Sequence, residues 1–574
     1  MGQLFITVLI TAIVVTILIV PLTKKIPKGE LTGKQFSILL TSVFLGSLIL
    51  TFLTVYISKV DLHWTVFLYV APVAALVGAL FAAGAEQKLK SVLTLISILA
   101  LAYLLAAPIF NAEQKYQSSE MEEQVEIQPF DETKTPASVP PKFAKNKMRK
   151  AFGQVPNTSY YELGHLQIQK VNGEFVYIAP VEFSGLFKWF NGKTTPGYFI
   201  MSATDSSDNP KFMAHEMAYI PSAYFNKNLE RHIRLQYPTL IFYGDVQLEI
   251  DDEGVPYYIR TYGDFISARN GFDVKGIVKV DAKTGQSEKI ALADVPEFID
   301  GAISPEAVSL QNSYYGNYVH GFWNSVFGKK DVKIPSDEGT EANVSPVFME
   351  DGEMYYFTDF SSPKEGVDSM LGYSLTHART GKATYYTGNL EESYMDSQGA
   401  LEIIEKKFIE KEWEGEMPIL YNFYGEASWL SAVLDSNGFL QNYFIVSAAN
   451  PEISAYAFTP NEALKLYKAA LSRGGSTVDG SSSAEEAQLT AKVLRVYKER
   501  VGDFTIVSLL TDTGQNFIVS SEAVPLAIYL EQGDEVTMTY YATGEQFQPI
   551  KQLTIRGVQK CRAVAGILNA FVCA

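Results

Sequence analysis

Four long apolar runs near the N-terminus place the strongest constraint on this chain of 574 residues. Each run has about 19–22 residues, enough for a helix to cross about 30 Å of hydrocarbon. None of the runs contains Asp, Glu, Lys, Arg or His, and none shows the polar stripe of a surface helix. The sequence therefore predicts four transmembrane helices, over Leu4–Leu22, Phe36–Ile57, Trp64–Ala83 and Ser91–Phe110.

Lysines in the short loops predict how these helices are oriented. The first and third loops carry Lys24, Lys25, Lys28, Lys34, Lys88 and Lys90, whereas loop 58–63 carries only Lys59 and Asp61. The positive-inside rule places the first and third loops in the cytoplasm. We therefore expect a multi-pass plasma-membrane protein with both termini and residues 111–574 outside the cytoplasm. A cleaved signal peptide is disfavoured, because only Met-Gly-Gln precedes the first run.

The absence of ionisable residues from the apolar runs argues against a transporter. Proton relays and ion pathways need intramembrane groups that carry or stabilise charge. Pro21 and Pro72 can kink a helix, and Gly78 and Gly84 can allow close packing, but neither pair makes a pathway. The helices are expected to serve as an anchor or as a surface for self-association.

Charge and cysteine content restrict the partners of the remaining chain. Of the net charge of −17, residues 1–110 contribute about +4 and residues 111–574 about −21. An acidic region of this kind repels nucleic acid, so no nucleic-acid partner is expected. The two cysteines, Cys561 and Cys573, lie in the tail, so no disulfide is expected within the large region. The sequence leaves open whether this tail is disulfide-bonded, lipidated or non-native.

Composition divides the rest of the chain into six segments. They are a linker at 111–158, a β-rich region at 159–395, an α+β module at 396–475, a Gly/Ser-rich linker at 476–487, a small barrel at 488–556 and an apolar tail at 557–574 that is unstructured or non-native. The first linker contains a short basic helix with Lys142, Lys145, Lys147, Arg149 and Lys150. This helix is a candidate contact with lipid headgroups. The alternative is a solvated helix face.

Turn signals recur along the β-rich region. Asn172-Gly173 between alternating residues predicts a hairpin. Asp-containing turns ending in Gly recur, as at Val278–Gly285 and Leu434–Gly438. We expect the carboxylate to cap its own turn there, because no segment has the ligand spacing of an EF-hand.

Two partial resemblances follow from these patterns. Asp396–Asn450 runs helix, strand, Asp-Ser-Asn-Gly turn, strand, and Val-Asp-Ala-Lys-Thr-Gly occurs near residue 281. These segments, around 240–290 and 396–450, resemble PepSY modules, which implies non-catalytic binding or regulation. The five predicted strands of 488–556, with Gly533-Asp534 before the fourth, resemble an OB-fold barrel. Outside the membrane we expect this barrel to be a spacer or an oligomerisation module.

No catalytic or metal-binding pattern stands out. The six histidines form no His-Glu-x-x-His motif or His/Cys cluster, and no nucleophile elbow, phosphate loop or dinucleotide fingerprint occurs. We therefore expect no cofactor, no metal and no enzymatic activity. A wall-polysaccharide hydrolase stays as an alternative, since it needs only two carboxylates.

Two aromatic clusters are candidates for an interaction surface. Large rings adjoin Gly residues in both, which suggests loops or close backbone approach. The candidate residues are Trp189, Phe190, Tyr314, Tyr315, Tyr318, Phe322 and Trp323. The alternative is core packing, because Tyr and Phe are favoured in strands.

The expected fold is a four-helix transmembrane region followed by a β-rich, α+β, multi-module extracytoplasmic region that ends in a small β-barrel. The favoured function is a cell-surface scaffold or assembly protein that homo-oligomerises in the lipid bilayer. The alternative is a monomeric sensor or regulator that binds a cell-wall enzyme, protease or peptide. Partners outside the membrane would be cell-surface proteins or polysaccharides.

Overall fold

The computed structural model describes residues 2–125, 130, 139–349, 351–364, 369–388, 393–474, 486–501, 504–521, 524–541 and 547–557. The chain divides into two compact units, and each is discontinuous in sequence. The first contains residues 1–124 and 139–387, and the second contains 125–138 and 388–574. Cys561, Cys573 and almost all of the expected tail and Gly/Ser-rich linker lie outside the described residues.

The first unit begins with four helices, the only ones in the described part of the chain that are long and apolar enough to cross a membrane. They are α1 (Gly2–Ile19), α2 (Gly33–Ser58), α3 (Phe67–Phe81, preceded by the 3-10 turn η1, Trp64–Val66) and α4 (Ala85–Phe110). α1 packs against α2 and α3, and α3 packs against α4. Gly78 permits the close approach of α1 and α3, because a Cβ there would lie 1.9 Å from the Leu18 carbonyl oxygen.

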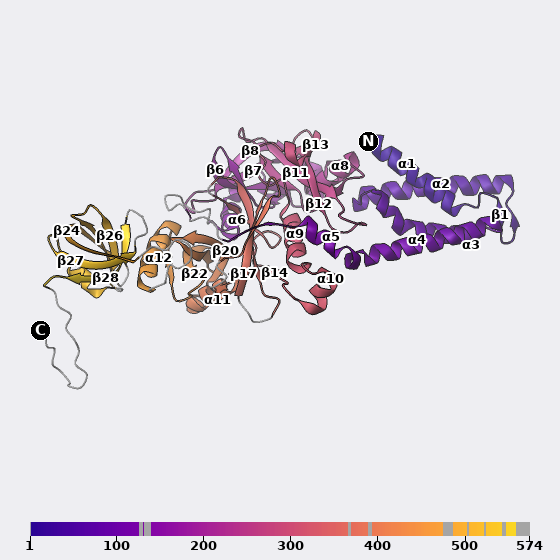
Figure 1. Cartoon of the computed structure of the whole chain (residues 1–574). Coiled ribbons are helices and arrows are strands. Elements are labelled where there is room, and N and C mark those ends of the chain that lie inside the picture. The colour runs from indigo at the N-terminus through magenta and orange to yellow at the C-terminus, as the bar shows by residue number, and fades with distance from the viewer. Residues whose placement is uncertain are drawn as a thin grey trace. The chain divides into compact units, whose positions relative to one another are not determined.

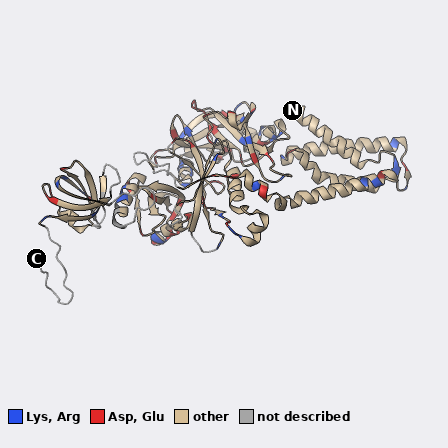
Figure 2. Cartoon of the chain, viewed as in Figure 1, with Lys and Arg blue, Asp and Glu red and all other residues tan. Residues whose placement is uncertain are grey.

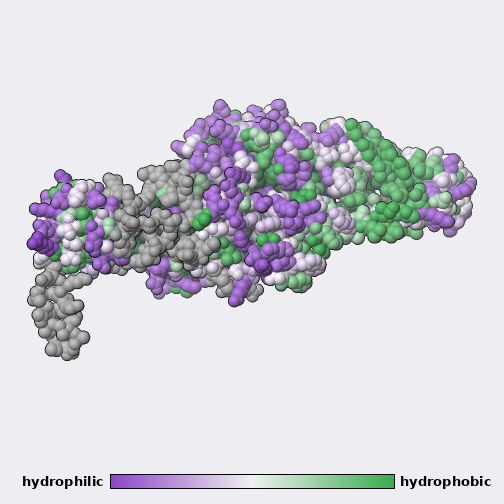
Figure 3. Space-filling view, in the orientation of Figure 1, coloured by the Kyte–Doolittle hydropathy of each residue, from purple (hydrophilic) through white to green (hydrophobic). Residues whose placement is uncertain are grey.

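The four helices present an apolar band between two polar ends (Figure 3). The short strands β1 (Lys25–Ile26) and β2 (Gly29–Glu30) form a hairpin at the end of the bundle far from the β-sheets (Figure 1). Lys and Arg gather at this far end (Figure 2). The N-terminus lies at the other end, beside α8 (Leu229–Gln236).

Two antiparallel sheets of the first unit share one hydrophobic core. In the first sheet β6 pairs with β4, β5 and β7, and β7 pairs with β8; in the second the order is β10-β11-β12-β13, with β9 also on β11. The core between them includes Ile178, Leu248, Tyr258 and Val278. The strands are β4 (Tyr161–Leu163), β5 (Gln167–Val171), β6 (Glu174–Phe183), β7 (Thr195–Ser202), β8 (Lys211–Met217), β9 (Ile241–Phe242), β10 (Gln247–Ile250), β11 (Pro256–Asp264), β12 (Asp273–Asp281) and β13 (Ser287–Ala291).

A third sheet of this unit has the order β14-β16-β17-β18-β3, with β15 on β16. Its strands are β3 (Glu122–Gln124), β14 (Ile334–Pro335), β15 (Ser345–Phe348), β16 (Met354–Ser361), β17 (Ser369–His377) and β18 (Ala383–Tyr386). The helices of the unit are α5 (Ala112–Ser118), α6 (Pro141–Lys150), α7 (Leu186–Gly192), α8, α9 (Pro305–Asn317) and α10 (Gly321–Trp323), which continues into the π-helical turn η6 (Asn324–Gly328). Single 3-10 turns are η2 (Ala151–Gln154), η3 (Thr158–Tyr160), η4 (Phe225–Lys227) and η5 (Leu292–Asp294).

The second unit contains a four-stranded sheet and a closed barrel. The sheet has the order β20-β21-β22-β23, and the barrel closes in the order β24-β25-β26-β28-β27. The sheet and its flanking elements are β19 (Tyr394–Met395), α11 (Ser397–Lys407), η7 (Ile409–Lys411), β20 (Glu414–Phe423), β21 (Glu426–Leu434), β22 (Leu440–Ser447), β23 (Ser454–Ala457) and α12 (Pro460–Gly474). The barrel consists of β24 (Glu486–Val501), β25 (Phe504–Thr511), β26 (Asn516–Ser520), η8 (Pro525–Tyr529), β27 (Glu535–Tyr541) and β28 (Phe547–Ile555).

The turn predictions are confirmed. Asn172 and Gly173 both have positive φ and join β5 to β6 in a two-residue hairpin. The Asp281 carboxylate accepts bonds from the backbone N–H groups of Lys283 and Thr284, at 2.9 and 2.7 Å. Asp435 caps the β21–β22 turn in the same way.

Residues 111–124 and 139–158 of the segment expected to be a linker instead belong to the first unit. β3 pairs in parallel with β18, and the ring of Tyr116 on α5 stacks on Tyr315. Phe143, Ala144 and Met148 bury one face of α6. The prediction was wrong here because a charged composition hid these few apolar contacts.

Candidate functional site

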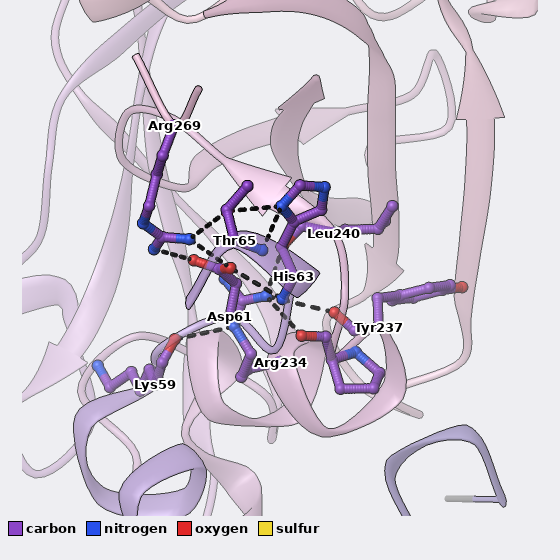
Figure 4. A network of polar contacts seen from close by, with 9 residues as sticks. Lys59, Asp61, His63, Thr65, Arg234, Tyr237, Leu240 and Arg269 are labelled. Atoms are coloured by element: carbon purple, nitrogen blue, oxygen red, sulfur yellow. Dashed lines mark hydrogen bonds and ion pairs between the residues drawn. The ribbon is translucent and has the colours of Figure 1, made fainter. Parts of the chain in front are cut away.

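A polar network joins the α2–α3 loop to the β-rich part of the first unit (Figure 4). We call it the loop network; it consists of Lys59, Asp61, His63, Thr65, Glu230, Arg231, Arg234 and Arg269. Its centre is α8, which the Asn228 side chain caps by accepting a bond from the Arg231 N–H at 3.1 Å. The helical period sends Leu229 and Ile233 into the core between the two sheets. Arg231 and Arg234 contact the end of α2 instead.

The two arginines of α8 bind carbonyl groups at the C-terminal end of α2. Arg231 Nε donates to the Tyr56 carbonyl at 2.7 Å, and Arg234 Nε donates to the Lys59 carbonyl at 2.8 Å. Carbonyls at a helix C-terminus lack intrahelical partners and carry the negative end of the helix dipole, so guanidinium groups suit them. Burial lowers the pKa of Arg234 to about 10, which leaves it charged at neutral pH.

Arg269 binds the loop through both of its terminal nitrogens. Nη1 donates to Asp61 Oδ1 at 3.0 Å and Nη2 to Asp61 Oδ2 at 2.6 Å. Burial raises the pKa of Asp61, but the Arg269 bonds outweigh burial and hold that pKa below its usual value. The fork geometry fixes the loop more firmly than a single contact would.

Apolar contacts and a second ion pair complete the attachment. Lys59 pairs with Glu230, and Leu62 N–H donates to the Pro238 carbonyl at 2.7 Å. Leu235 packs in a cluster with Leu4, Val8, Val55 and Leu62. The loop, α1 and the end of α2 are therefore held against α8 by charge, hydrogen bonds and packing together.

A cavity of about 340 Å³ is lined by residues of the first two sheets and by Glu230 of α8. Four carboxylates face it, together with hydroxyl groups and one imidazole; they belong to Glu162, Glu182, Glu230, Asp245, Ser222, Tyr258 and His165. Burial lowers the pKa of His165, which therefore favours the neutral imidazole. Among the described residues, no three or more His, Cys, Asp or Glu side chains are arranged so that they could hold one metal ion. The chemistry of the cavity suits a polar or cationic small molecule.

Glu182 is the most buried carboxylate of the cavity. It accepts bonds from the Ser222 N–H at 3.0 Å and from the Ser222 hydroxyl, and Tyr258 OH donates to it at 3.2 Å. Burial outweighs these bonds and raises the pKa of Glu182 to about 7. Glu182 therefore changes charge near neutral pH.

Glu230 belongs to both the cavity and the loop network, because it lines the cavity and pairs with Lys59 of the loop. Burial raises the pKa of Glu230, but the Lys59 hydrogen bond and the nearby Arg260 charge lower it by more. The pKa of Glu230 is therefore below its ordinary value, and the carboxylate stays ionised. Glu230 thus connects the cavity directly to the α2–α3 loop.

The structure separates the predicted aromatic surface into buried and exposed parts. Tyr314 and Tyr315 are buried in the first unit, where Tyr315 packs with Phe360 and Tyr385, so neither can form an exposed surface. Tyr318 and Phe322 are half-buried. Trp189 is half-buried against the shared core. Only Phe190 and Trp323 of the set are largely exposed.

The predicted membrane contact of the basic helix is not supported by its position. α6 lies away from the helix bundle (Figure 1). Lys147 Nζ donates to the Ser206 and Asp208 carbonyls at 2.8 and 2.6 Å. Lys142, Lys145, Arg149 and Lys150 share this helix, and their contact with lipid headgroups stays a prediction.

Buried carboxylates also occur away from the cavity. Glu249 accepts a bond from the Gly301 N–H at 3.1 Å, and Asp300 accepts one from the Lys170 N–H at 2.6 Å and pairs with Arg379. Both carboxylates are enclosed by protein. They join strands and loops, and they do not form the open pair that a hydrolase would need.

Sequence inspection missed the arginines of the loop network and Glu230. Asp61 and Arg269 are far apart in sequence, so no local pattern could pair them. The one available signal was the α2–α3 loop, which combines Lys59, Asp61 and His63 where the other loops are mainly basic.

Comparisons with known proteins give little further information. No family model matches the sequence, and no curated protein matches it. The chain resembles a thermostable family-43 glycoside hydrolase with a TM-score of 0.17 and 9% identity, over 71% of this chain and 97% of that one. It resembles a glycosyl hydrolase from Bacteroides ovatus with a TM-score of 0.16 and 11% identity, over 63% of this chain and 83% of that one. It resembles an α-L-arabinofuranosidase from Lactobacillus brevis with a TM-score of 0.17 and 10% identity, over 68% of this chain and 93% of that one. At such TM-scores the resemblance carries no argument about fold or activity.

Proposed function

We propose that this chain is a membrane-anchored, non-enzymatic assembly protein that self-associates through its helices and holds its β-rich region outside the cytoplasm. The observation that carries the proposal is the loop network. A simple tether would need one span and a flexible linker. Here the arginines of α8 bind the loop and the end of α2, which fixes the orientation of the β-rich part on its anchor.

A second attachment supports the same conclusion. α4 continues into α5, whose Lys115 lies 5.3 Å from the ring of Tyr314 on α9. The next strand, β3, pairs with β18. The bundle of α1 to α4 is therefore attached to the β-rich part at both α8 and α9, as a rigid platform for assembly requires.

The outer helices supply surface for self-association. Only 6% of the apolar window of α2 and 17% of that of α4 is buried within the chain. Ser42 and Gly46 lie four residues apart on the exposed face of α2. Small residues at this spacing allow helices to approach closely in membranes.

The mass of the full chain in nanodiscs tests the proposal. We expect a multiple of 63.7 kDa above one. Gly46→Leu should shift the mass towards the monomer, and it should not disturb the chain itself, since a Cβ at Gly46 meets no atom within 4 Å. Ile49→Leu, also on the exposed part of α2, is the matched control. A monomeric wild-type chain would refute the assembly function.

Orientation is tested by labelling single cysteines in intact cells with a membrane-impermeant reagent. The background carries Cys561→Ser and Cys573→Ser. Lys193→Cys should be labelled, whereas Lys28→Cys, in the β1–β2 hairpin region, should be labelled only after permeabilisation. The reverse pattern would contradict an extracytoplasmic β-rich region.

The shared position of Glu230 favours a second candidate function, a sensor that reports cavity occupancy to the helices. In a sensor, Glu230→Gln should uncouple the cavity from the loop without changing the mass in nanodiscs. Hydrogen exchange of loop 59–65, measured with and without a co-purifying small molecule, distinguishes this function. If the exchange rate of loop 59–65 in the wild-type chain is the same with and without the small molecule, the sensor function is excluded.

A further inference from the structure

The turn formed by α10 and η6 exposes a compact apolar face. Trp323 is 61% exposed and Phe327 76% exposed, and their rings stack with centroids 5.9 Å apart. Val326 is exposed beside them. The spacing of residues 323, 326 and 327 places all three on one side of a helical turn. Lys329 and Lys330 follow directly and are also exposed.

This face lies at the end of the fourth apolar helix. α10 contacts both α4 and α5, which meet at Phe110 and Asn111. Figure 1 shows α10 beside the end of α4 nearest the sheets. The exposed rings are therefore placed where the hydrocarbon core of a membrane would give way to headgroups.

A second aromatic face lies near the end of α2. Phe187 on α7 is 80% exposed, and Phe190 and Phe225 are also exposed. The rings of Phe190 and Phe225 lie 5.9 Å apart. Asn226, adjacent to Phe225, accepts a bond from Tyr56 OH of α2 at 3.2 Å. This contact sets the second face at the same end of the bundle as the first.

We infer that these two faces insert into the headgroup region of the membrane that the helices span, so that the β-rich part rests on the outer leaflet. The faces are the α10–η6 face (Trp323, Val326, Phe327) and the α7–η4 face (Phe187, Phe190, Phe225). Trp64, exposed at the start of the third span, belongs to the same belt.

Three observations favour lipid over a protein partner. Both faces adjoin the ends of apolar helices, so they continue the apolar surface of helices long enough to cross a membrane. Trp323 is of a residue type enriched at membrane interfaces, and Trp and Phe together are typical of the apolar faces of interfacial segments. Exposed lysines flank them, with Lys329 and Lys330 beside one and Lys193 beside the other, in reach of anionic headgroups.

The test uses the full chain in nanodiscs, with an environment-sensitive fluorophore on single cysteines in the Cys561→Ser, Cys573→Ser background. Labels replace Phe327 and Phe225 in turn, and doxyl lipids supply the quencher. Trp64→Cys is the positive reference. Met213→Cys, an exposed apolar position on β8 away from the bundle, is the matched negative reference. All four sites are exposed, so the substitutions should leave the fold intact.

We expect the labels at 327 and 225 to lose fluorescence as the label at 64 does, and the label at 213 to keep it. Labels at 327 or 225 that match 213 would overturn the inference. A blue-shifted label that lipid does not quench would also overturn it, because protein would then cover the face. An unquenched label at 64 would contradict the membrane anchor itself and, with it, this inference.

Discussion

The Arg269–Asp61 pair allows a quantitative prediction about the loop network. The side chains are 19% and 10% exposed, so the pair is neither fully buried nor on the surface. Arg269→Ala leaves Asp61 with a hydrogen bond from the His63 N–H at 3.0 Å. Exposed pairs contribute up to about 1 kcal/mol, and breaking a buried pair costs about 3–5 kcal/mol. We therefore expect loop release to become easier by about 2–3 kcal/mol.

Hydrogen exchange of peptide 59–66 in nanodiscs measures this release directly. The Leu62 N–H, which donates to Pro238, is the reporter amide. With tenfold for each 1.4 kcal/mol, the exchange rate should rise by about 30- to 150-fold. Lys275→Ala is the matched control, because its pair with Asp273 is about half exposed and lies outside the network. Exchange in Arg269→Ala that equals wild type would refute the energetic role of the pair.

The pH dependence of this effect has a defined sign. The pKa of Asp61 lies below its ordinary 3.8 in the folded state, so the stabilising contribution is complete above that ordinary value. It is lost only as the pH falls through the lowered pKa. Besides burial, the Arg269 charge lowers the pKa of the neighbouring His63. The difference between wild type and Arg269→Ala should therefore be constant above about pH 8 and should shrink as His63 protonates at lower pH.

Three further predictions concern stability. Glu182 has a pKa of about 7 against an ordinary 4.5, so its stabilising contribution is complete below the ordinary value and is lost as the pH rises through 7. Between pH 4.5 and pH 7 the free energy of unfolding of the wild type should fall by about 3 kcal/mol relative to that of Glu182→Gln, as measured by melting curves at several pH values. Equal pH dependence of stability in the two proteins would contradict this. Gly78→Ala should destabilise the helices by about 1–3 kcal/mol, because its Cβ would meet the Leu18 carbonyl, whereas Gly46→Ala should be neutral; equal melting temperatures would be evidence against the close contact. Trp429→Phe removes a 3.0 Å indole bond to a backbone carbonyl and should make the second unit easier to proteolyse, at a cost of about 1–3 kcal/mol; unchanged proteolysis would count against it.

Features that rest on local pattern were predictable from the sequence. The four apolar runs match α1 to α4 with small shifts, the largest at the start of α4, where Glu86, Lys88 and Lys90 continue the helix beyond the apolar residues. Asn172-Gly173 and Asp281 fixed their turns because each satisfies its own backbone. The barrel of the second unit is closed, but its resemblance to the OB fold, like that of 396–450 to PepSY modules, stays a prediction.

Features that depend on distant residues were not predictable. Tyr314 and Tyr315 sit in an aromatic run that looks like a surface loop, yet both are buried on α9, where Tyr315 packs on Phe360 and Tyr385 of the third sheet. The basic residues of α6 suggested lipid, but Phe143 and Met148 direct the helix onto protein. Arg234 gave no signal at all, since its partners are backbone carbonyls.

The discontinuity of the second unit has a consequence for biosynthesis. Phe130, from the short segment 125–138, packs on Tyr421 and Phe423, and its N–H donates to the Asn422 carbonyl at 2.8 Å. About 290 residues separate Phe130 from these partners, and at about 5–20 residues per second the ribosome needs roughly 15–60 s to supply them. The first unit is thus complete on the nascent chain before the second can close, and any excised version of the second unit must carry residues 125–138 with it.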